Sequence, residues 1–220
     1  MKLIKQAFKE NYKSILSGIF LGLFVFLLLV VFSCKSAEPK TASSDLLKGK
    51  SCILVIAPEN FRDEEFVITK NTLIENGAYV EVASVRKGII KGMLGLEVNV
   101  NKTISEFSPS DFDCVVVIGG SGAPTLLEYP EVINFVGSAY KLNKTIAGIC
   151  LGPMILAKAG VLNGKKATVF ETDDSLRIFN ENNVTFLRKQ VVVDGNIITS
   201  NNPKYAKEFA DALVDLLSKN

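Results

Sequence analysis

The sequence predicts an α/β fold in which a doubly wound parallel sheet is sandwiched between helices. Two observations predict it. Continuous apolar runs, as expected for strands covered on both faces, alternate along the chain with segments of helical character. Glycine-rich turns follow two of these runs, where a strand would lead into a loop or a helix. Ligands of such sheets bind beyond the carboxyl ends of the strands, so residues that follow a strand are the first candidates for a site.

The strands and helices can be placed in order from the apolar pattern and the turn signals. The predicted strands are Ser51–Ala57, Tyr79–Val85, Cys114–Ile118, Thr145–Ile149, Ala167–Phe170 and Val184–Leu187, with one or two short strands within 86–100. The predicted helices are Glu64–Asn76, Glu131–Leu142, one that begins near Pro153 and reaches Leu162, Asp174–Asn180 and Lys204–Lys219, with a helical turn in Lys102–Phe107. Near the C-terminus, Val191–Val193 and Asn196–Thr199 flank Asp194-Gly195, which predicts a small antiparallel hairpin.

The N-terminal 49 residues are set apart from the predicted domain. Lysines precede an uncharged, strongly apolar segment, Ile15–Ser33, and Cys34 and a polar stretch follow. We therefore expect a signal peptide or transmembrane anchor over 1–33, a linker over 34–49 and a folded domain over 50–220. The pattern ending at Cys34 resembles a bacterial lipoprotein site at which that cysteine is lipidated; alternatively the segment spans the membrane once. The positive-inside tendency places the domain on the extracytoplasmic side in both cases.

The charge and the cysteines exclude several classes of function. The formal net charge is +2, but residues 1–33 alone carry +3, which leaves a nearly neutral body with no electrostatic footprint for nucleic acid. The chain has four cysteines and no histidine, and no spacing suggests a metal site. Cys52 and Cys114 open two strands in the same relative position. They are interpreted as small core residues, with a disulfide as the alternative if the strands are neighbours in an exported protein.

Cys150 is the first candidate for chemistry. It lies in Gly148-Ile149-Cys150-Leu151-Gly152, between a predicted strand and a predicted helix. The pattern G-x-C-x-G in that context is typical of a nucleophile elbow, with cysteine in place of serine. The helix N-terminus supplies partial positive charge and free N–H groups, so we expect the thiol to ionise more easily than usual. The alternative is a small buried hydrophobic residue at a strand end.

Two other loops are expected at the same edge of the sheet. The loop 119–122, Gly-Gly-Ser-Gly, offers backbone N–H groups that could form half of an oxyanion hole, with the N–H of Leu151 as the other half. The loop after the first strand supplies the acids Asp63, Glu64 and Glu65, which could equally be a charged helix N-terminus. A carboxyl kept protonated by burial beside Cys150 could donate a hydrogen bond to the thiolate and pass on a proton.

Together these motifs resemble the DJ-1/PfpI (ThiJ/PfpI) superfamily over about 50–217. The matching stretches are FRDEEF (61–66), VASV (82–85), KGM (91–93), DFD (111–113), VIGG (117–120), AGICLGP (147–153), LAKAGVL (156–162) and VVVDGN (191–196). The resemblance implies a flavodoxin-like sandwich, as in class I glutamine amidotransferases, and commonly a homo-oligomer. It implies a reactive Cys150 paired with Glu65, with the N–H groups of Gly120 and Leu151 as the oxyanion hole, and no cofactor.

Members of this family are described as glyoxalases, deglycases, cysteine peptidases, chaperones and oxidative-stress sensors. This chain departs from the family where a histidine would stand: Leu151 follows the cysteine, and Phe170 occupies the DJ-1-like position. Three hypotheses follow: a membrane-anchored Cys150/Glu65 enzyme acting on reactive carbonyls or glycated groups, a non-catalytic redox-sensing or binding protein, and a structural domain with an inert cysteine. Peptide hydrolysis ranks last because its amine leaving group needs a proton, usually from histidine.

Overall fold

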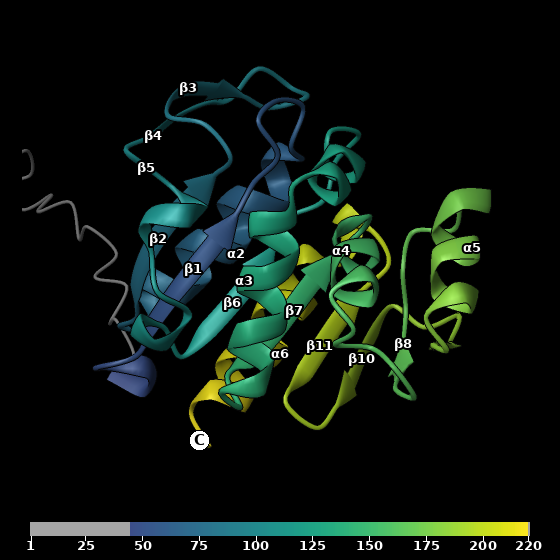
Figure 1. Ribbon diagram of the computed structural model, residues 1–220. Coiled ribbons are helices and arrows are strands. Elements are labelled where there is room, and N and C mark those ends of the chain that lie inside the picture. The colour runs from purple at the N-terminus through teal and green to yellow at the C-terminus, as the bar shows by residue number, and fades with distance from the viewer. Residues whose placement is uncertain (1–44, 220) are drawn as a thin grey trace, which may run out of the picture. The chain divides into compact units, whose positions relative to one another are not determined.

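The computed structural model describes residues 45–219, and this part of the chain is built on one seven-stranded sheet (Figure 1). In spatial order its strands are β10 (Val191–Asp194), β11 (Ile197–Ser200), β7 (Thr145–Ile149), β6 (Cys114–Val117), β1 (Ser51–Val55), β2 (Tyr79–Ser84) and β5 (Lys102–Thr103). All neighbours pair in parallel except β10 and β11. The predicted doubly wound sheet and its C-terminal hairpin are both confirmed.

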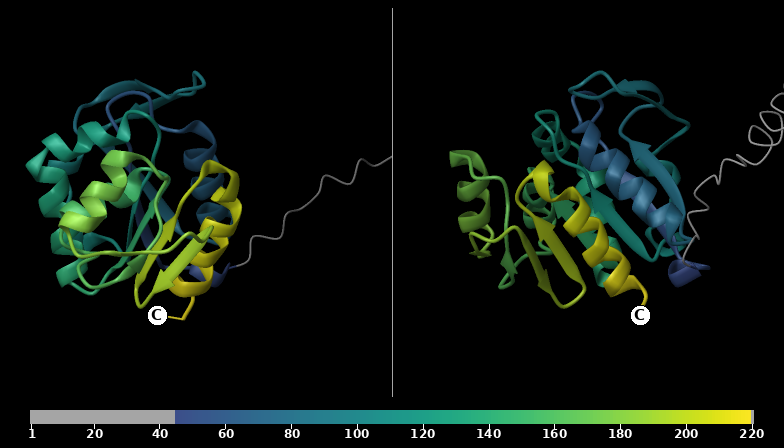
Figure 2. Two further views of the ribbon diagram at one scale, coloured as in Figure 1. Left: turned by 90° about the vertical axis from the view of Figure 1, so that its right-hand side faces the viewer. Right: turned by 180° about the vertical axis from the view of Figure 1, so that it is seen from behind.

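Two layers of helices cover the sheet, as views from opposite sides show (Figures 1 and 2). The helices are α2 (Asp63–Glu75), α3 (Pro130–Lys141), α4 (Gly152–Lys158), α5 (Asp173–Glu181) and α6 (Ala206–Leu217). Strand residues alternate between the two layers: Ile53 and Val55 belong to the core cluster that includes residues of α3, α4 and α5, whereas Cys52 and Leu54 belong to the cluster that includes residues of α2 and α6. Both faces of each central strand are therefore buried, which explains the uninterrupted apolar runs in the sequence.

Smaller elements lie at the edges. They are the 3-10 helices η1 (Asp45–Leu47), η2 (Ile104–Glu106), η3 (Pro109–Asp111), η4 (Ala123–Glu128) and η5 (Pro203–Tyr205), the antiparallel pair β3 (Gly88–Lys91) and β4 (Glu97–Val100), and the parallel pair β8 (Lys166–Ala167) and β9 (Thr185–Phe186). The two short strands expected within 86–100 are thus present, as a hairpin above the carboxyl end of β1 (Figure 1).

Two predicted boundaries were wrong by more than two residues. The helix after the elbow ends at Lys158 rather than Leu162, because Gly160 adopts φ +75° and turns the chain. The predicted strand Ala167–Phe170 shrinks to the two residues of β8, because the backbone of Phe170 leaves the ladder and bonds the elbow instead. No helix within residues 45–219 is both long and apolar enough to cross a membrane. The anchor over 1–33, Cys34 and most of the linker lie outside the described residues.

Candidate active site

Cys150 lies at the carboxyl end of β7, in the turn that leads into α4, and its backbone is left-handed with φ +58°. Such a conformation costs a non-glycine residue on the order of 1–3 kcal/mol and persists only where surrounding contacts hold it. Here two backbone hydrogen bonds hold it. The Cys150 N–H donates to the carbonyl of Ser200 (2.8 Å), and its carbonyl accepts from the N–H of Phe170 (2.9 Å). The predicted nucleophile elbow is therefore present in its backbone geometry.

The Glu65 carboxyl reaches the Cys150 side chain from the first turn of α2. Glu65 is fully buried, and its Oε2 accepts a hydrogen bond from the N–H of Gly119 (2.8 Å). The Glu65 carboxyl and the Cys150 side chain both border the Cα of Gly119, and each group shifts the pKa of the other. Glu65 thus meets Gly119, 54 positions later in the chain, over the end of β6, as the predicted topology suggested.

The glycines after β6 allow this approach. A Cβ on Gly119 would lie 2.7 Å from the Cys150 Cβ and 2.8 Å from the Glu65 Oε2. Gly120 has φ +105°, and a Cβ there would lie 2.5 Å from the backbone nitrogen of Arg62. Contacts this short do not occur, so no larger residue fits without moving the loop. The N–H groups of Gly120 and Leu151, the two predicted oxyanion-hole donors, both lower the pKa of the Cys150 thiol.

The expectation that the Cys150 thiol ionises easily was wrong. Burial, and then the negative charge of Glu65, raise the Cys150 pKa to about 12, and the N–H groups of Gly120 and Leu151 only partly offset this. Burial likewise raises the pKa of Glu65 to about 8, although the hydrogen bond from Gly119 lowers it. The carboxyl is therefore protonated at neutral pH, as expected for a buried acid. The two groups share one low-dielectric space, so they lose their protons as a pair.

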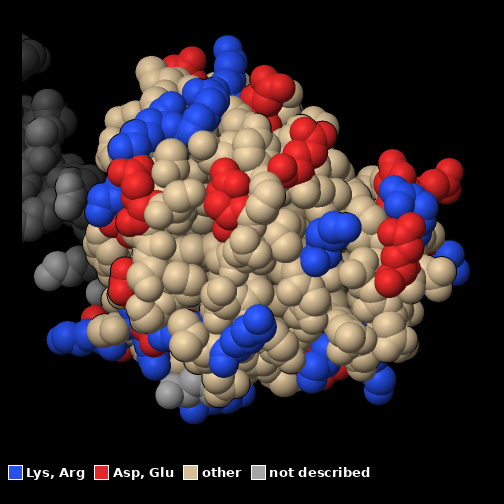
Figure 3. Space-filling view, in the orientation of Figure 1, with Lys and Arg blue, Asp and Glu red and all other residues tan. Residues whose placement is uncertain are grey.

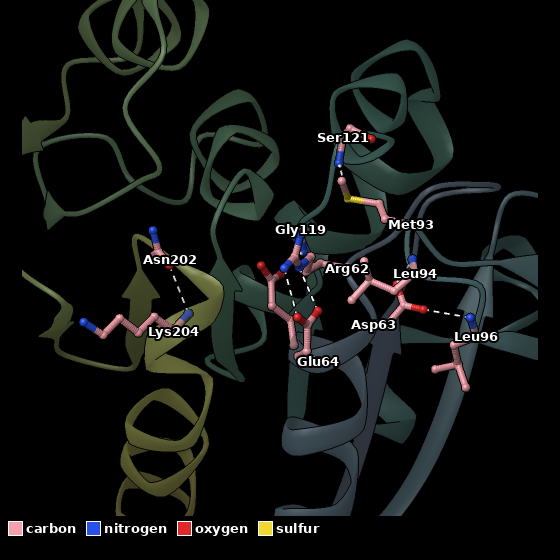
Figure 4. A network of polar contacts seen from close by, with 11 residues as sticks. Arg62, Asp63, Glu64, Met93, Leu94, Leu96, Gly119, Ser121, Asn202 and Lys204 are labelled. Atoms are coloured by element: carbon pink, nitrogen blue, oxygen red, sulfur yellow. Dashed lines mark hydrogen bonds and ion pairs between the residues drawn. The ribbon is translucent and has the colours of Figure 1, made fainter.

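Asp63 has a structural task that the sequence did not reveal. It is almost buried, and its carboxylate accepts the N–H groups of Leu94 (2.9 Å) and Leu96 (2.8 Å) in the β3–β4 turn (Figure 4). The same turn carries Met93, whose Sδ accepts from the N–H of Ser121 (3.3 Å). Asp63 therefore ties the β3–β4 hairpin to the rim of the site. The sequence carried one signal of this contact, the glycine at position 92. A Cβ there would lie 2.6 Å from the Asp63 carboxylate.

The two positions at which the family resemblance predicts a histidine, Leu151 and Phe170, both lie close to the elbow. Leu151 follows Cys150 directly and is partly buried, and the ring of Phe170 is 40 % exposed while its backbone bonds Cys150. Within residues 45–219 no cluster of three or more histidine, cysteine, aspartate or glutamate side chains could hold a metal ion. Cys52 and Cys114 are partners in register on β1 and β6, and both are free, buried thiols.

The sequence comparisons place the chain in a family. Residues 50–216 match the model of the DJ-1/PfpI family. The chain belongs to this family. It is 38% identical over 175 residues to protein MJ0967 of Methanocaldococcus jannaschii (79% of this chain, 85% of that protein). It is 34% identical over 167 residues to Deglycase PfpI of Pyrococcus furiosus (73% of this chain, 98% of that protein).

A solved structure agrees with this assignment. The ThiJ/PfpI domain protein of Brachyspira murdochii superposes with a TM-score of 0.75 at 31% identity, over 79% of this chain and 99% of that chain. The flavodoxin-like sandwich expected from the motifs is therefore the fold of this DJ-1/PfpI member. The family model matches residues 50–216, so the expected anchor and linker stay predictions.

Proposed function

We propose that this DJ-1/PfpI protein is a cysteine-dependent enzyme that acts on small reactive carbonyl compounds, in the manner of a glyoxalase or deglycase. One observation carries the proposal: the buried Glu65 carboxyl lies beside Cys150, which occupies a strained strand-to-helix turn. Backbone strain together with perturbed titration is concentrated at functional sites. The similarity to a protein named a deglycase, over nearly all of that protein's length, supports the same chemistry.

In the proposed first step, Cys150 is the nucleophile and Glu65 carries the proton. Once the pair has lost one proton, the remaining proton can lie on Glu65, which leaves the sulfur as the thiolate. The thiolate attacks the aldehyde carbon, a carbon–sulfur bond forms, and the π electrons of the carbonyl move to its oxygen. Glu65 then gives its proton to that oxygen. The product is a hemithioacetal, and Glu65 is left as the carboxylate.

The N–H groups of Gly120 and Leu151 would stabilise the charge on the oxygen in that step. Both act on the sulfur strongly enough to lower its pKa, so we expect an oxygen on the carbon bonded to the sulfur to lie within their reach. For a 2-oxoaldehyde, the Glu65 carboxylate would next take the proton from the first carbon and give it to the second, while the hydroxyl proton on the first carbon passes to the oxygen on the second. That transfer oxidises the first carbon and reduces the second, and water cleaves the resulting thioester to a 2-hydroxy acid and free Cys150. No external oxidant or reductant is needed.

A non-catalytic redox sensor is the second candidate, and one observation favours it. The chain has no histidine to relay protons during catalysis, whereas oxidation of a sulfur needs no such relay. A protonated Glu65 could hold an oxidised form of the Cys150 sulfur by a hydrogen bond. Mild peroxide should then oxidise Cys150 ahead of Cys52 and Cys114, and turnover of carbonyl substrates should be absent.

The cellular setting is also part of the proposal. We propose that residues 1–33 direct the domain to a membrane, with Cys34 lipidated or the segment spanning once, and that the domain faces the extracytoplasmic side as a homo-oligomer. We propose no nucleic-acid partner. Basic and acidic side chains are scattered over the face in Figure 3 with wide uncharged areas between them, in keeping with the near-neutral charge of the body.

Turnover of methylglyoxal tests the enzymatic proposal. Full-length protein is assayed as the wild type and as Cys150→Ala, Glu65→Gln and Cys114→Ala, the last being a matched control with a buried cysteine far from the rim. Cys150→Ala should abolish turnover, Glu65→Gln should reduce it by about 100-fold or more, and Cys114→Ala should leave it unchanged. The wild-type rate should rise with pH up to about 8, where Glu65 loses its proton. Equal rates for the wild type and Cys150→Ala would remove the proposal.

A further inference from the structure

The mouth of the site carries an ion pair that the chemistry proposed above does not use. Arg62, which precedes α2, pairs with Glu64 through its Nε (2.7 Å to Oε2) and its Nη2 (2.9 Å to Oε1). Both side chains are partly open to solvent, with 28% and 40% of their area exposed. Within residues 45–219, no hydrogen bond of the Arg62 Nη1 is found. One edge of the guanidinium therefore remains available to a ligand that enters from solvent.

Arg62 lies next to the reacting sulfur. Its backbone N–H donates to the carbonyl of Gly119 (3.0 Å), the residue whose own N–H holds Glu65 and whose Cα faces the Cys150 Cβ. Figure 4 shows the Arg62 side chain beside Gly119 and Glu64. The charges interact accordingly: Glu64 raises the pKa of Arg62 most, and Glu65 and Cys150 raise it further. The guanidinium thus lies within electrostatic range of both members of the Cys150–Glu65 pair.

The position of Arg62 is not explained by the stability of α2. A cation at a helix N-terminus opposes the helix dipole, which favours negative charge there. A partly exposed ion pair between near neighbours in the chain contributes little, typically below about 1 kcal/mol. The acids Asp63, Glu64 and Glu65 would complement the dipole without Arg62. An arginine fork at this place is better explained by recognition of a planar anion, which it binds with two parallel hydrogen bonds.

The other charges at the rim leave room for an anion. Asp63 is occupied by the N–H groups of Leu94 and Leu96. Burial keeps Glu65 protonated at neutral pH, because its pKa is about 8. Glu64 is balanced by Arg62 itself. An approaching carboxylate therefore meets no uncompensated negative charge among these groups, and it meets one open guanidinium edge.

We propose that Arg62 forms a carboxylate-binding subsite beside Cys150, so that the preferred ligands are small carbonyl compounds that also carry a carboxylate. The inference deepens the proposed function and rests on it for the identity of the reaction. The subsite itself needs only a reactive Cys150. A neutral dicarbonyl would react at the same sulfur without this contact and would bind more weakly. Glu64 keeps the guanidinium oriented when no ligand is bound.

Alkylation of Cys150 by iodoacetate and by iodoacetamide tests the subsite without requiring turnover. In both reactions the Cys150 sulfur bonds to the CH₂ carbon, iodide leaves with the electrons of the carbon–iodine bond, and the thiol proton goes to solvent. The two reagents differ in that only iodoacetate carries a carboxylate. The rates are measured on full-length protein by peptide mass, and their ratio is compared between variants, so the intrinsic reactivities of the reagents cancel.

The variants are Arg62→Gln, Arg62→Lys and Glu64→Gln, with Arg177→Gln as the matched control because Arg177 forms an exposed ion-paired cluster on α5 away from the site. Arg62→Gln should lower the iodoacetate-to-iodoacetamide ratio by about tenfold. Arg62→Lys should retain part of the preference, because it keeps the charge but not the fork. Glu64→Gln should raise the ratio, and Arg177→Gln should leave it unchanged.

If neither Arg62 variant folds, the rate ratio of the wild-type protein still tests the subsite. Its ratio, relative to that of free cysteine, should fall as salt rises from about 0.02 M to about 0.5 M, since salt screens a partly exposed charge contact. A ratio unaffected by both Arg62 variants, or a wild-type ratio equal to that of free cysteine at every salt concentration, overturns the subsite. Failure to turn over methylglyoxal with the ratio intact would instead remove the enzymatic proposal and leave the subsite standing.

Discussion

Cysteines at the two ends of the same parallel sheet lie in different environments. At the amino end, Cys52 on β1 and Cys114 on β6 lie in register, both fully buried in the layer formed with α2 and α6. At the carboxyl end, Cys150 is also buried, with 7% of its area exposed. The difference lies in the backbone and in the neighbours. The pair sits in extended strands, whereas Cys150 sits in a left-handed turn among a carboxyl group and two N–H donors.

Burial alone does not separate an inert thiol from a reactive one. It raises the pKa of Cys114 well above the usual range, and it raises that of Cys150 too. At the amino end the second cause is the neighbouring thiol of Cys52, which can offer no proton-accepting group of suitable strength. At the carboxyl end Glu65 can take the thiol proton, and the N–H groups of Gly120 and Leu151 favour the anion. The proposed reactivity of Cys150 would therefore come from polar partners, not from exposure.

The sharpest test of this contrast is the rate of thiol modification in the folded protein. Cys150 should react with iodoacetamide at least about 1,000-fold faster than Cys52 or Cys114, because the pair can react only after an opening that approaches global unfolding. Peptide mass spectrometry after timed quenching gives the three rates. Rates within tenfold of one another would show that the two ends of the sheet do not differ as described.

A methyl group at Gly119 should damage the carboxyl end specifically. The added Cβ of Gly119→Ala would lie 2.6 Å from the carbonyl of Ile149 and 2.7 Å from the Cys150 Cβ, and neither atom can rotate away. We expect a loss of about 2–3 kcal/mol in the free energy of unfolding and about 100-fold slower modification of Cys150. Urea unfolding and thiol labelling measure the two effects.

Gly137→Ala is the control for that substitution. Gly137 lies within α3, and its Cβ would meet one atom, the carbonyl of Ala159, at 3.1 Å. The gain in helix propensity and this tight contact should nearly cancel, so stability should change by less than about 1 kcal/mol. A Gly119→Ala protein as stable and as reactive as Gly137→Ala would mean that the loop after β6 has room to move.

The buried acid should make stability depend on pH. The pKa of Glu65 is raised from 4.5 to about 8 on folding, so the folded state binds more protons than the unfolded state between these values. Stability should therefore fall as the pH rises from about 5 to about 8.5, by on the order of 2–4 kcal/mol. Glu65→Gln should flatten this slope in urea midpoints, whereas Glu75→Gln, at the exposed end of the same helix, should not. An unchanged slope in Glu65→Gln would place the titration elsewhere.

The smallest effect is expected at the amino end. Cys114→Ala removes one buried sulfur and should cost about 1–2 kcal/mol in the free energy of unfolding. The iodoacetamide rate of Cys150 should not change, because the substituted residue lies at the opposite end of β6. Calorimetry and labelling of the same preparation check both statements. A tenfold change in the iodoacetamide rate of Cys150 would contradict this expectation and would show that the two ends of β6 are coupled.

Most of the fold could be predicted from local patterns in the sequence. The apolar runs predicted β1, β6 and β7, and Asp194-Gly195 predicted the hairpin of β10 and β11. The boundaries at Lys158 and Ala167 were missed, because they depend on one glycine with positive φ and on a backbone bond from Phe170 to the elbow. The meeting of Glu65 and Cys150 was expected from topology and from the family resemblance. The raised Cys150 pKa was not, because local helix charge was weighed without the burial that accompanies it.

The sequence by itself determined which residues can do chemistry: one cysteine in a glycine-flanked turn, three acids after the first strand and no histidine. These features are local, since turn geometry and residue type are set within a few positions. Only the tertiary structure decided how the acids divide their tasks. Asp63 binds the β3–β4 turn and Glu64 pairs with Arg62. Glu65 is buried beside Cys150. Burial and long-range distance set those roles, and neither is encoded in any single stretch of the chain.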